Sequence, residues 1–197
     1  MAKIILFIGA PGSGKGSRGK VCEEHGYIHI SSSRLLSQVG YEVNNSTNPP
    51  NELIIELIKK VISSVDENAT IILDGFPRNF KQLEMLEREI DIFKAIYFKI
   101  QKGIALQRVI DRLVCPNCGE IYTKNLYKQP KQDNICDKCG SLLKERDGDN
   151  KVIFKKRFNF FAKNTYPIID YYGKKGKLVT IDATQPNEEI ITIINSL

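Results

Sequence analysis

The sequence lacks long hydrophobic runs, internal repeats and low-complexity tracts. Crossing a bilayer as a helix takes roughly 18 apolar residues in a row, and no stretch of the chain approaches that length. The first ten residues carry only Lys3 ahead of a short apolar run, without the small-residue cleavage site of a secretory leader. We therefore expect a soluble protein that has no membrane partner and is located in the cytoplasm.

Charge is not concentrated in any one segment either. Lys and Arg number 29 and Asp and Glu 23, which gives a formal net charge of +6 and a pI near 9.0. This excess suits a polyanionic partner, either a nucleic acid or a nucleotide. Because no basic patch is interleaved with aromatic residues, on which single strands would stack, we do not expect a nucleic acid partner.

The pattern of apolar residues predicts an α/β fold. A chain of 197 residues can bury one substantial core and carry one or two small insertions. Helices are expected at 14–24, briefly at 35–43, and at 52–65, 82–90, 104–113, 152–172 and 188–194, and strands at 3–9, 28–30, 70–73, 95–100 and 177–181. Strands and helices that alternate in this way indicate a doubly wound parallel sheet.

A glycine-rich loop separates the first expected strand from the first expected helix. Glycines let backbone amides turn toward phosphate oxygens, and the N-terminus of the helix adds a positive dipole. Lys15 can reach a transferring phosphate, and Ser17 can bind Mg²⁺ directly or through water. A simple turn is the alternative, but the strand, the lysine and the hydroxyl together favour a nucleotide site. Its expected ligands are Gly12, Ser13, Gly14, Lys15, Gly16 and Ser17.

The ending Gly14-Lys15-Gly16-Ser17 resembles the adenylate kinase family, and so does the later segment Asp74-Gly75-Phe76-Pro77-Arg78. This second segment follows a buried strand, where a carboxylate and a guanidinium would face a ligand crevice. The resemblance implies that Asp74 orders Mg²⁺ and its waters, that Arg78 grips the phosphate of AMP, and that Gln82 reads the adenine of AMP.

The resemblance also gives roles to residues nearer the C-terminus. Arg108 and Arg112, expected one helical turn apart, match the pair at the hinge of the family's lid, with Arg108 against the ATP adenine and Arg112 on the phosphates. Arg146 and Arg157 match the pair that follows the lid and surrounds the transferring phosphoryl group, and Gln185 lies near the ATP adenine. Converging arginines suit phosphoryl transfer because negative charge is spread over the equatorial oxygens.

The implied activity is that of a monomeric ATP:AMP phosphotransferase, which converts ATP and AMP reversibly into two ADP with Mg²⁺ and maintains the adenine nucleotide pool. The implied catalytic residues are Lys15, Asp74, Arg78, Arg112, Arg146 and Arg157. The implied AMP ligands are Ser32, Arg34, Gly75, Arg78, Gln82, Arg146 and Arg157. The expected divisions are a core at 1–30, 53–112 and 151–197, an acceptor-nucleotide segment at 31–52 and a lid at 113–150.

Four of the five cysteines form two close pairs, Cys115 with Cys118 and Cys136 with Cys139, and each pair is followed by glycine. Seventeen residues separate the pairs. Four thiolates at this spacing suit a structural Zn²⁺ with no open position, although iron and two disulfides are alternatives. The surrounding segment is too polar for its own core, so a metal should hold it together. Cys22, the fifth cysteine, is expected to be a small buried residue.

One stretch departs from the family pattern. Members commonly carry Ser-Thr-Gly-Asp followed, three residues after the Asp, by an arginine that binds the AMP phosphate. Here residues 31–37 read SSSRLLS, so Arg34 replaces the acidic residue and Ser37 the arginine. We expect Arg34 to substitute partly for the lost arginine. Gly148 stands in place of the first of two lid aspartates and leaves Asp149, which is expected to alter lid closure.

Two alternative functions remain open at this point. The same fold could prefer another acceptor, such as UMP or CMP, or another donor, such as GTP. The amide of Gln82 favours AMP because it can pair with adenine through two hydrogen bonds. The second alternative is a nucleotide-binding homologue without catalytic activity that works through its lid, for example on nucleic acid.

Overall fold

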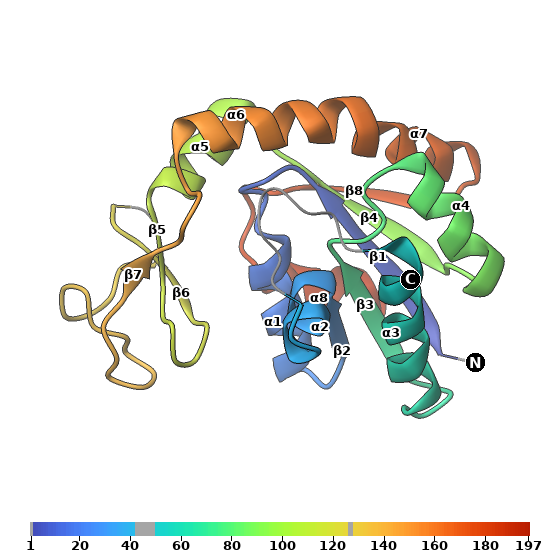
Figure 1. Cartoon of the computed structure of the whole chain (residues 1–197), viewed down its shortest axis with the longest axis horizontal. Helices are drawn as coiled ribbons and strands as arrows, with labels where there is room; N and C mark the ends of the chain where they lie inside the picture. The colour runs from blue at the N-terminus through green and yellow to red at the C-terminus, as the bar shows by residue number, and fades with distance from the viewer. Residues whose placement is uncertain (1, 42–49, 126–127) are drawn as a thin grey trace.

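The computed structural model describes residues 2–41, 50–125 and 128–197. A five-stranded parallel sheet forms its centre in the order β2-β3-β1-β4-β8 (Figure 1). Its strands are β1 (Lys3–Gly9), β2 (Ile28–Ser31), β3 (Thr70–Asp74), β4 (Lys94–Lys99) and β8 (Leu178–Asp182). All four neighbouring pairs are parallel, so the carboxyl ends of the strands lie along one edge. The predicted α/β fold with a parallel sheet is confirmed.

Helices cover both faces of this sheet, which explains the unbroken apolar run of β1. Ile4, Leu6 and Ile8 join one hydrophobic cluster, and Ile5 and Phe7 join another on the opposite face. Successive side chains of a strand point to opposite faces, so a strand covered on both sides needs apolar residues at every position. The first cluster includes residues of α3 (Asn51–Ser63), α4 (Phe80–Glu89) and α7 (Tyr166–Lys174), and the second includes residues of α1 (Lys15–Glu24) and α8 (Glu189–Asn195).

The helix predicted at 152–172 has a wider turn within it. It consists of α6 (Lys151–Phe160), the π-helix η1 (Phe161–Thr165) and α7, which follow one another along the sheet (Figure 1). Pro167 has no N–H to donate to the preceding turn, which accounts for an irregular turn just before it. The buried Thr165 donates a hydrogen bond to the carbonyl oxygen of Arg78 (2.7 Å), so η1 is tied to the loop after β3.

A second, antiparallel sheet, in the order β6-β5-β7, lies in the segment predicted to be a lid, and this segment is called the lid below (Figure 1, left). The helix predicted at 104–113 is wrong at its end, because α5 stops at Ile110 and the chain enters β5 at Arg112. Asp111 between them is buried, and its carboxylate accepts hydrogen bonds from the backbone and side-chain nitrogens of Asn125 (2.9 and 2.8 Å). These lid contacts end the helix. The elements concerned are α5 (Lys102–Ile110), β5 (Arg112–Val114), β6 (Ile121–Thr123) and β7 (Lys144–Glu145).

Part of the predicted acceptor segment, residues 42–49, lies outside the described residues. Before it, α2 (Ser32–Gln38) begins three residues earlier than the short helix predicted at 35–43. In the described part of the chain, no helix combines the length and the apolar character needed to cross a membrane.

Candidate active site

The loop between β1 and α1 surrounds the side chain of Lys15. Its Nζ donates to the carbonyl oxygens of Gly9 (2.8 Å) and Ala10 (3.3 Å). Gly12 has a φ of 82°, and a Cβ there would lie 2.3 Å from the carbonyl oxygen of Ala105 in α5. Only glycine fits this position, so contact with α5 helps to fix the loop. The loop and the N-terminus of α1 together form a site suited to phosphate.

Asp74 ends β3 and pairs in register with Phe7 of β1, which places its carboxylate at the same edge as the phosphate loop. Burial lowers the pKa of Lys15, and the charge of Asp74 opposes that shift. Asp74 Oδ2 lies 3.9 Å from Nε2 of the buried His29, and Oδ1 has no hydrogen-bond partner among the described residues. A carboxylate with an uncommitted oxygen at this edge fits the predicted role beside Mg²⁺ and its waters.

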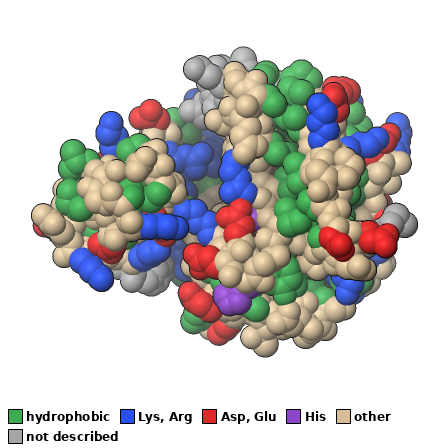
Figure 2. Space-filling view, turned by 90° about the horizontal axis from the view of Figure 1, so that it is seen from below, with side chains coloured by type: hydrophobic (Ala, Val, Ile, Leu, Met, Phe, Trp, Pro, Cys, Tyr) green, Lys and Arg blue, Asp and Glu red, His purple; other side chains and the backbone are tan. Residues whose placement is uncertain are grey.

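The four arginines predicted to surround the phosphates do converge at this edge. Burial lowers the pKa values of Arg78, Arg146 and Arg157, and the charge of Arg112 lowers the last two further. Three of the four also lower the pKa of Lys15. Figure 2 shows Lys and Arg side chains gathered where the lid meets the core. Buried cations repel one another, so a polyphosphate with several negative charges is the anion that this site suits.

Arg112 is oriented by Asp149. Its Nε and Nη2 donate to Oδ2 and Oδ1 of Asp149, each at 2.7 Å, and only 3% of the Asp149 side chain is exposed. The chain enters the lid at Arg112 and leaves it near Asp149, so this bidentate pair joins the two segments that connect the lid to the core. It also fixes the orientation of a guanidinium that is predicted to contact phosphate.

The predicted donor-base residues lie around the loop that follows β8. Arg108 donates to the carbonyl oxygen of Ala183 (2.8 Å), and the carbonyl oxygen of the exposed Gln185 accepts a hydrogen bond from Arg18 (2.8 Å). Sequence reasoning did not identify Arg18, although it contacts both loops of the predicted donor site. An arginine in a surface helix gives no signal of burial, and two of the three carbonyls that accept its hydrogen bonds are distant in sequence.

Two of the residues predicted to bind AMP, Ser32 and Gly75, lie beside the converging arginines. A Cβ on Gly75 would be 2.6 Å from Oγ of the buried Ser32, which places these residues in contact. Gln82 accepts a hydrogen bond from the backbone nitrogen of Arg78 (2.7 Å) and donates from Nε2 to Oδ1 of Asn51 (2.9 Å). The amide of Gln82 is therefore held between the loop after β3 and the start of α3.

Arg34 is directed elsewhere. Its Nη2 forms an ion pair with Oε1 of Glu23 (2.5 Å) and donates to the carbonyl oxygen of His29. In the described structure no recorded contact joins Arg34 to the converging arginines. The structure thus does not bring Arg34 to the converging arginines, where a substitute for the family's AMP-binding arginine would be needed.

Comparison with known proteins accounts for this arrangement. The family model described as adenylate kinase matches residues 7–177. The adenylate kinase of Rickettsia rickettsii (strain Sheila Smith) is 33% identical over 208 residues, which cover 98% of both chains. That of Petrotoga mobilis is also 33% identical and covers 94% of this chain and 93% of its own. The chain belongs to the adenylate kinase family. It is therefore a phosphotransferase that acts on nucleoside monophosphates.

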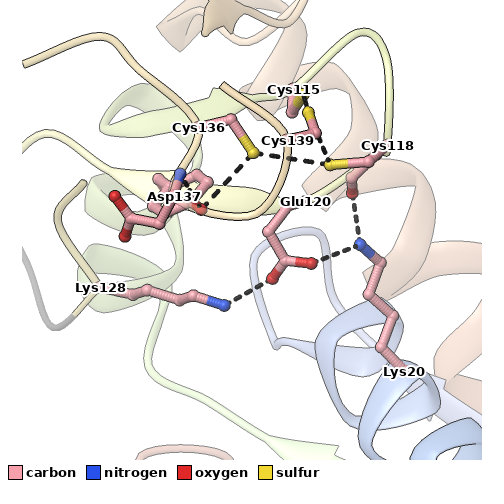
Figure 3. A network of polar contacts seen from close by, with 10 residues as sticks. Lys20, Cys115, Cys118, Glu120, Lys128, Cys136, Asp137 and Cys139 are labelled. Atoms are coloured by element: carbon pink, nitrogen blue, oxygen red, sulfur yellow. Dashed lines mark hydrogen bonds and ion pairs between the residues drawn. The ribbon is translucent and has the colours of Figure 1, made fainter. Parts of the chain in front are cut away.

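The lid of this adenylate kinase family member contains a cluster of four free cysteines (Figure 3). Sulfur atoms lie 3.4 Å apart in Cys115 and Cys139, 3.5 Å in Cys118 and Cys136, and 3.6 Å in Cys118 and Cys139. A disulfide would bring two sulfurs to about 2.05 Å, whereas tetrahedral Zn–S bonds of about 2.3 Å separate them by about 3.8 Å. The thiols are free and arranged as a four-cysteine group that could hold a metal.

Each of the two cysteine pairs lies in a backbone turn of the same kind. The backbone nitrogen of Gly119 donates to the carbonyl oxygen of Cys115 (2.9 Å), and that of Gly140 donates to Cys136 in the same way (2.8 Å). The four sulfur atoms all lie within 4.8 Å of one another, close enough to be ligands of one ion. The donor set and its geometry therefore fit the predicted metal.

The first cysteine turn also touches the core. Nζ of Lys20 on α1 donates to the carbonyl oxygen of Gly119 (2.5 Å) and lies 3.4 Å from Glu120 (Figure 3). The other carboxylate oxygen of Glu120 pairs with Lys128 of the lid (2.5 Å). Burial raises the pKa of Glu120, but the two lysines lower it more, so its pKa lies below the ordinary value. The lid is thereby connected to the helix that follows the phosphate loop.

Proposed function

We propose that the chain transfers the γ-phosphoryl group of ATP to AMP, reversibly, giving two ADP. The observation that carries this proposal is the convergence of one lysine and four arginines on a glycine loop at the carboxyl edge of a parallel sheet. Five cations around one small site exceed what a single phosphate needs. They match the charge of two nucleotides that meet end to end. The five are Lys15, Arg78, Arg112, Arg146 and Arg157.

The proposed reaction is a direct in-line displacement. An oxygen of the AMP phosphate forms a bond to the γ-phosphorus of ATP, and the bond to the β,γ-bridging oxygen breaks with its electron pair, releasing ADP. The AMP oxygen is already ionised, so no protein base or nucleophile is needed. When bound, Mg²⁺ neutralises phosphate charge, and Asp74 and Ser17 are the residues that would hold it with its waters.

The hydrogen bonds from Lys15 to the carbonyl oxygens of Gly9 and Ala10 keep its side chain inside the loop. When ATP binds, Lys15 would donate to the phosphates of ATP in place of these oxygens. Gly12, Ser13, Gly14 and Gly16 would present the loop amides. Arg112 is held at the hinge by Asp149, ready to contact phosphate when the lid closes over the site. Closure would exclude water and so suppress hydrolysis of ATP.

On the acceptor side we propose that Arg78 binds the AMP phosphate and that Gln82 pairs with adenine, assisted by Ser32 and Gly75. The amide of Gln82 would exchange its bond to Asn51 for the base. For Arg34 the hypothesis of partial substitution requires the side chain to leave Glu23. Arg34→Ala is then expected to raise the KM for AMP about threefold, and an unchanged KM measured beside the wild type would sink the hypothesis.

The lid metal is proposed to be Zn²⁺ in a structural role, because four thiolates leave no position open for substrate. Free thiols in this arrangement require a reducing compartment, which supports a location in the cytoplasm. We propose that the enzyme works as a monomer, because the residues proposed here for both nucleotide sites can be brought together within a single chain.

A coupled assay of ADP formation from ATP, Mg²⁺ and AMP tests the proposal. Rapid formation of ADP that depends on AMP is expected, with little turnover when ATP is alone or when UMP or CMP replaces AMP. GTP in place of ATP tests the donor. Preferred turnover with UMP or CMP would contradict the role of Gln82. No turnover with any monophosphate, by protein that binds ATP and holds its metal, would contradict the kinase function itself.

A further inference from the structure

Arg18 is a buried guanidinium directly behind the phosphate loop. Its side chain, from the first turns of α1, is 1% exposed. Nη1 donates to the carbonyl oxygen of Ser13 (3.1 Å), and Nη2 donates to those of Ala183 (3.3 Å) and Gln185 (2.8 Å). A Cβ on Gly14 would lie 2.7 Å from Nη1. One side chain thus joins the loop after β1 to the loop after β8, from beneath both.

The charge of Arg18 is costly where it lies. Among the described residues no carboxylate forms an ion pair with it, and backbone carbonyls accept all of its recorded hydrogen bonds. Its guanidinium also lies 5.1 Å from the centre of the Phe98 ring. Burial and then the neighbouring Arg108 lower the pKa of Arg18, and the charges of Glu188, Glu189 and Asp182 oppose that shift only in part. A neutral amide could tie two loops together with less desolvation.

The position of Arg18 supplies a reason for the charge. Its Nη1 lies against Gly14, which is itself part of the phosphate loop. A polyphosphate held by that loop would add negative charge to that of the acidic residues that already act on Arg18. Arg108 of α5 donates to the same Ala183 carbonyl (2.8 Å). The base-side loop is therefore held by two guanidinium groups that meet at one oxygen.

We propose that Arg18 is a positioning residue for the donor nucleotide, which fixes the distance between the phosphate loop and the loop at 183–185 that faces the donor base. This role of Arg18 rests on the proposed function, in which the two loops bind the two ends of ATP. A fixed separation favours a donor of one size and base, because both ends must be seated together for binding. Arg18 touches neither substrate nor reacting atoms. Its effect should fall on ATP and leave AMP unaffected.

The test compares Arg18→Gln and Arg18→Lys with Arg88→Gln, which makes the same chemical change at an exposed position of α4. For Arg18→Gln we expect the KM for ATP to rise about tenfold, the KM for AMP to stay within about twofold, and the preference for ATP over GTP to fall. Arg18→Lys keeps the charge but cannot reach three carbonyls, so an intermediate KM is expected. Arg88→Gln should match the wild type.

An Arg18→Gln protein that is folded and has a wild-type KM for ATP would overturn the proposal, and so would equal rises for ATP and AMP. If that variant does not fold, calorimetric titration of Arg18→Lys with ATP gives the answer, a wild-type Kd being the contrary result. This titration also works without turnover. A wild type that binds ATP but makes no ADP would overturn the proposed function alone, whereas unchanged ATP affinity in Arg18→Lys would overturn the role of Arg18.

Discussion

The parallel core sheet and the lid sheet are stabilised by different means. Ile71, Ile72 and Leu73 of β3 have no exposed surface, and hydrophobic clusters cover both faces of the core sheet. Among the residues that the structure describes, the lid cluster has Leu113, Tyr122 and Leu143 beside its cysteines. A fully buried large apolar side chain contributes about 1.5–3 kcal/mol, while ordering the backbone costs about 1–2 kcal/mol per residue. Apolar burial therefore accounts for the core, and the lid needs its four thiols.

The same division separates the chemistry from the closing of the site. The phosphate loop and Asp74 belong to the core, whereas Arg112 lies where the chain enters the lid. A substitution in the phosphate loop should then stop turnover without changing the lid. Loss of the metal should undo the lid without unfolding the core.

The largest effect is expected from Lys15→Met. Removing the lysine that is proposed to contact the transferring phosphate should lower kcat by about 10³-fold or more, because its positive charge would stabilise the negative charge on that phosphate in the transition state. Thermal unfolding should change little, since methionine keeps the apolar stem. The control is Lys3→Met, which makes the same change at the start of β1, at the end of that strand away from the loop. It should keep full activity. A Lys15→Met enzyme with more than about a tenth of the wild-type kcat would contradict the assignment.

The second effect concerns the lid metal. Chelation, or the double substitution Cys136→Ser with Cys139→Ser, should lower activity at least about tenfold, because Arg112 and Arg146 lose the fold that holds them. Thermal unfolding of the core should remain. Titration with a thiol reagent should detect four additional reactive thiols after chelation, since burial raises the pKa of Cys22 to about 12 and keeps it unreactive.

Cys22→Ala provides the control for that experiment. It removes the one cysteine of the core and should leave both the metal content and the count of four released thiols unchanged. A lid that keeps its hydrogen-exchange protection after the metal is removed would show that the comparison between the two sheets is wrong.

The sequence was informative about the site wherever a residue's role depends on its neighbours along the chain. The apolar runs predicted the parallel sheet, and the loop before α1 predicted the place of Lys15. Arg18 could not be found in this way, because its partner Ala183 is 165 residues distant. The end of α5 was not predicted because it depends on the contact between Asp111 and Asn125 of the lid. The direction of the Arg34 side chain was not predicted either, because it depends on the ion pair with Glu23 on another helix. These contacts exist only in the folded chain.

The smallest effect should come from the contact between the two regions. Lys20→Met removes the hydrogen bond from α1 to Gly119 and the partner of Glu120, while its apolar stem remains. A partly exposed ion pair contributes about 0.2–1 kcal/mol, so the balance between a lid held against α1 and a lid released from it should shift by roughly 1.5- to 5-fold. We expect a rise of that size in the KM for ATP, and faster hydrogen exchange at residues 115–120. Lys128→Met also deprives Glu120 of a partner, but within the lid, and should change neither quantity. Equal behaviour of the two variants would mean that Lys20 does not hold the lid to the core.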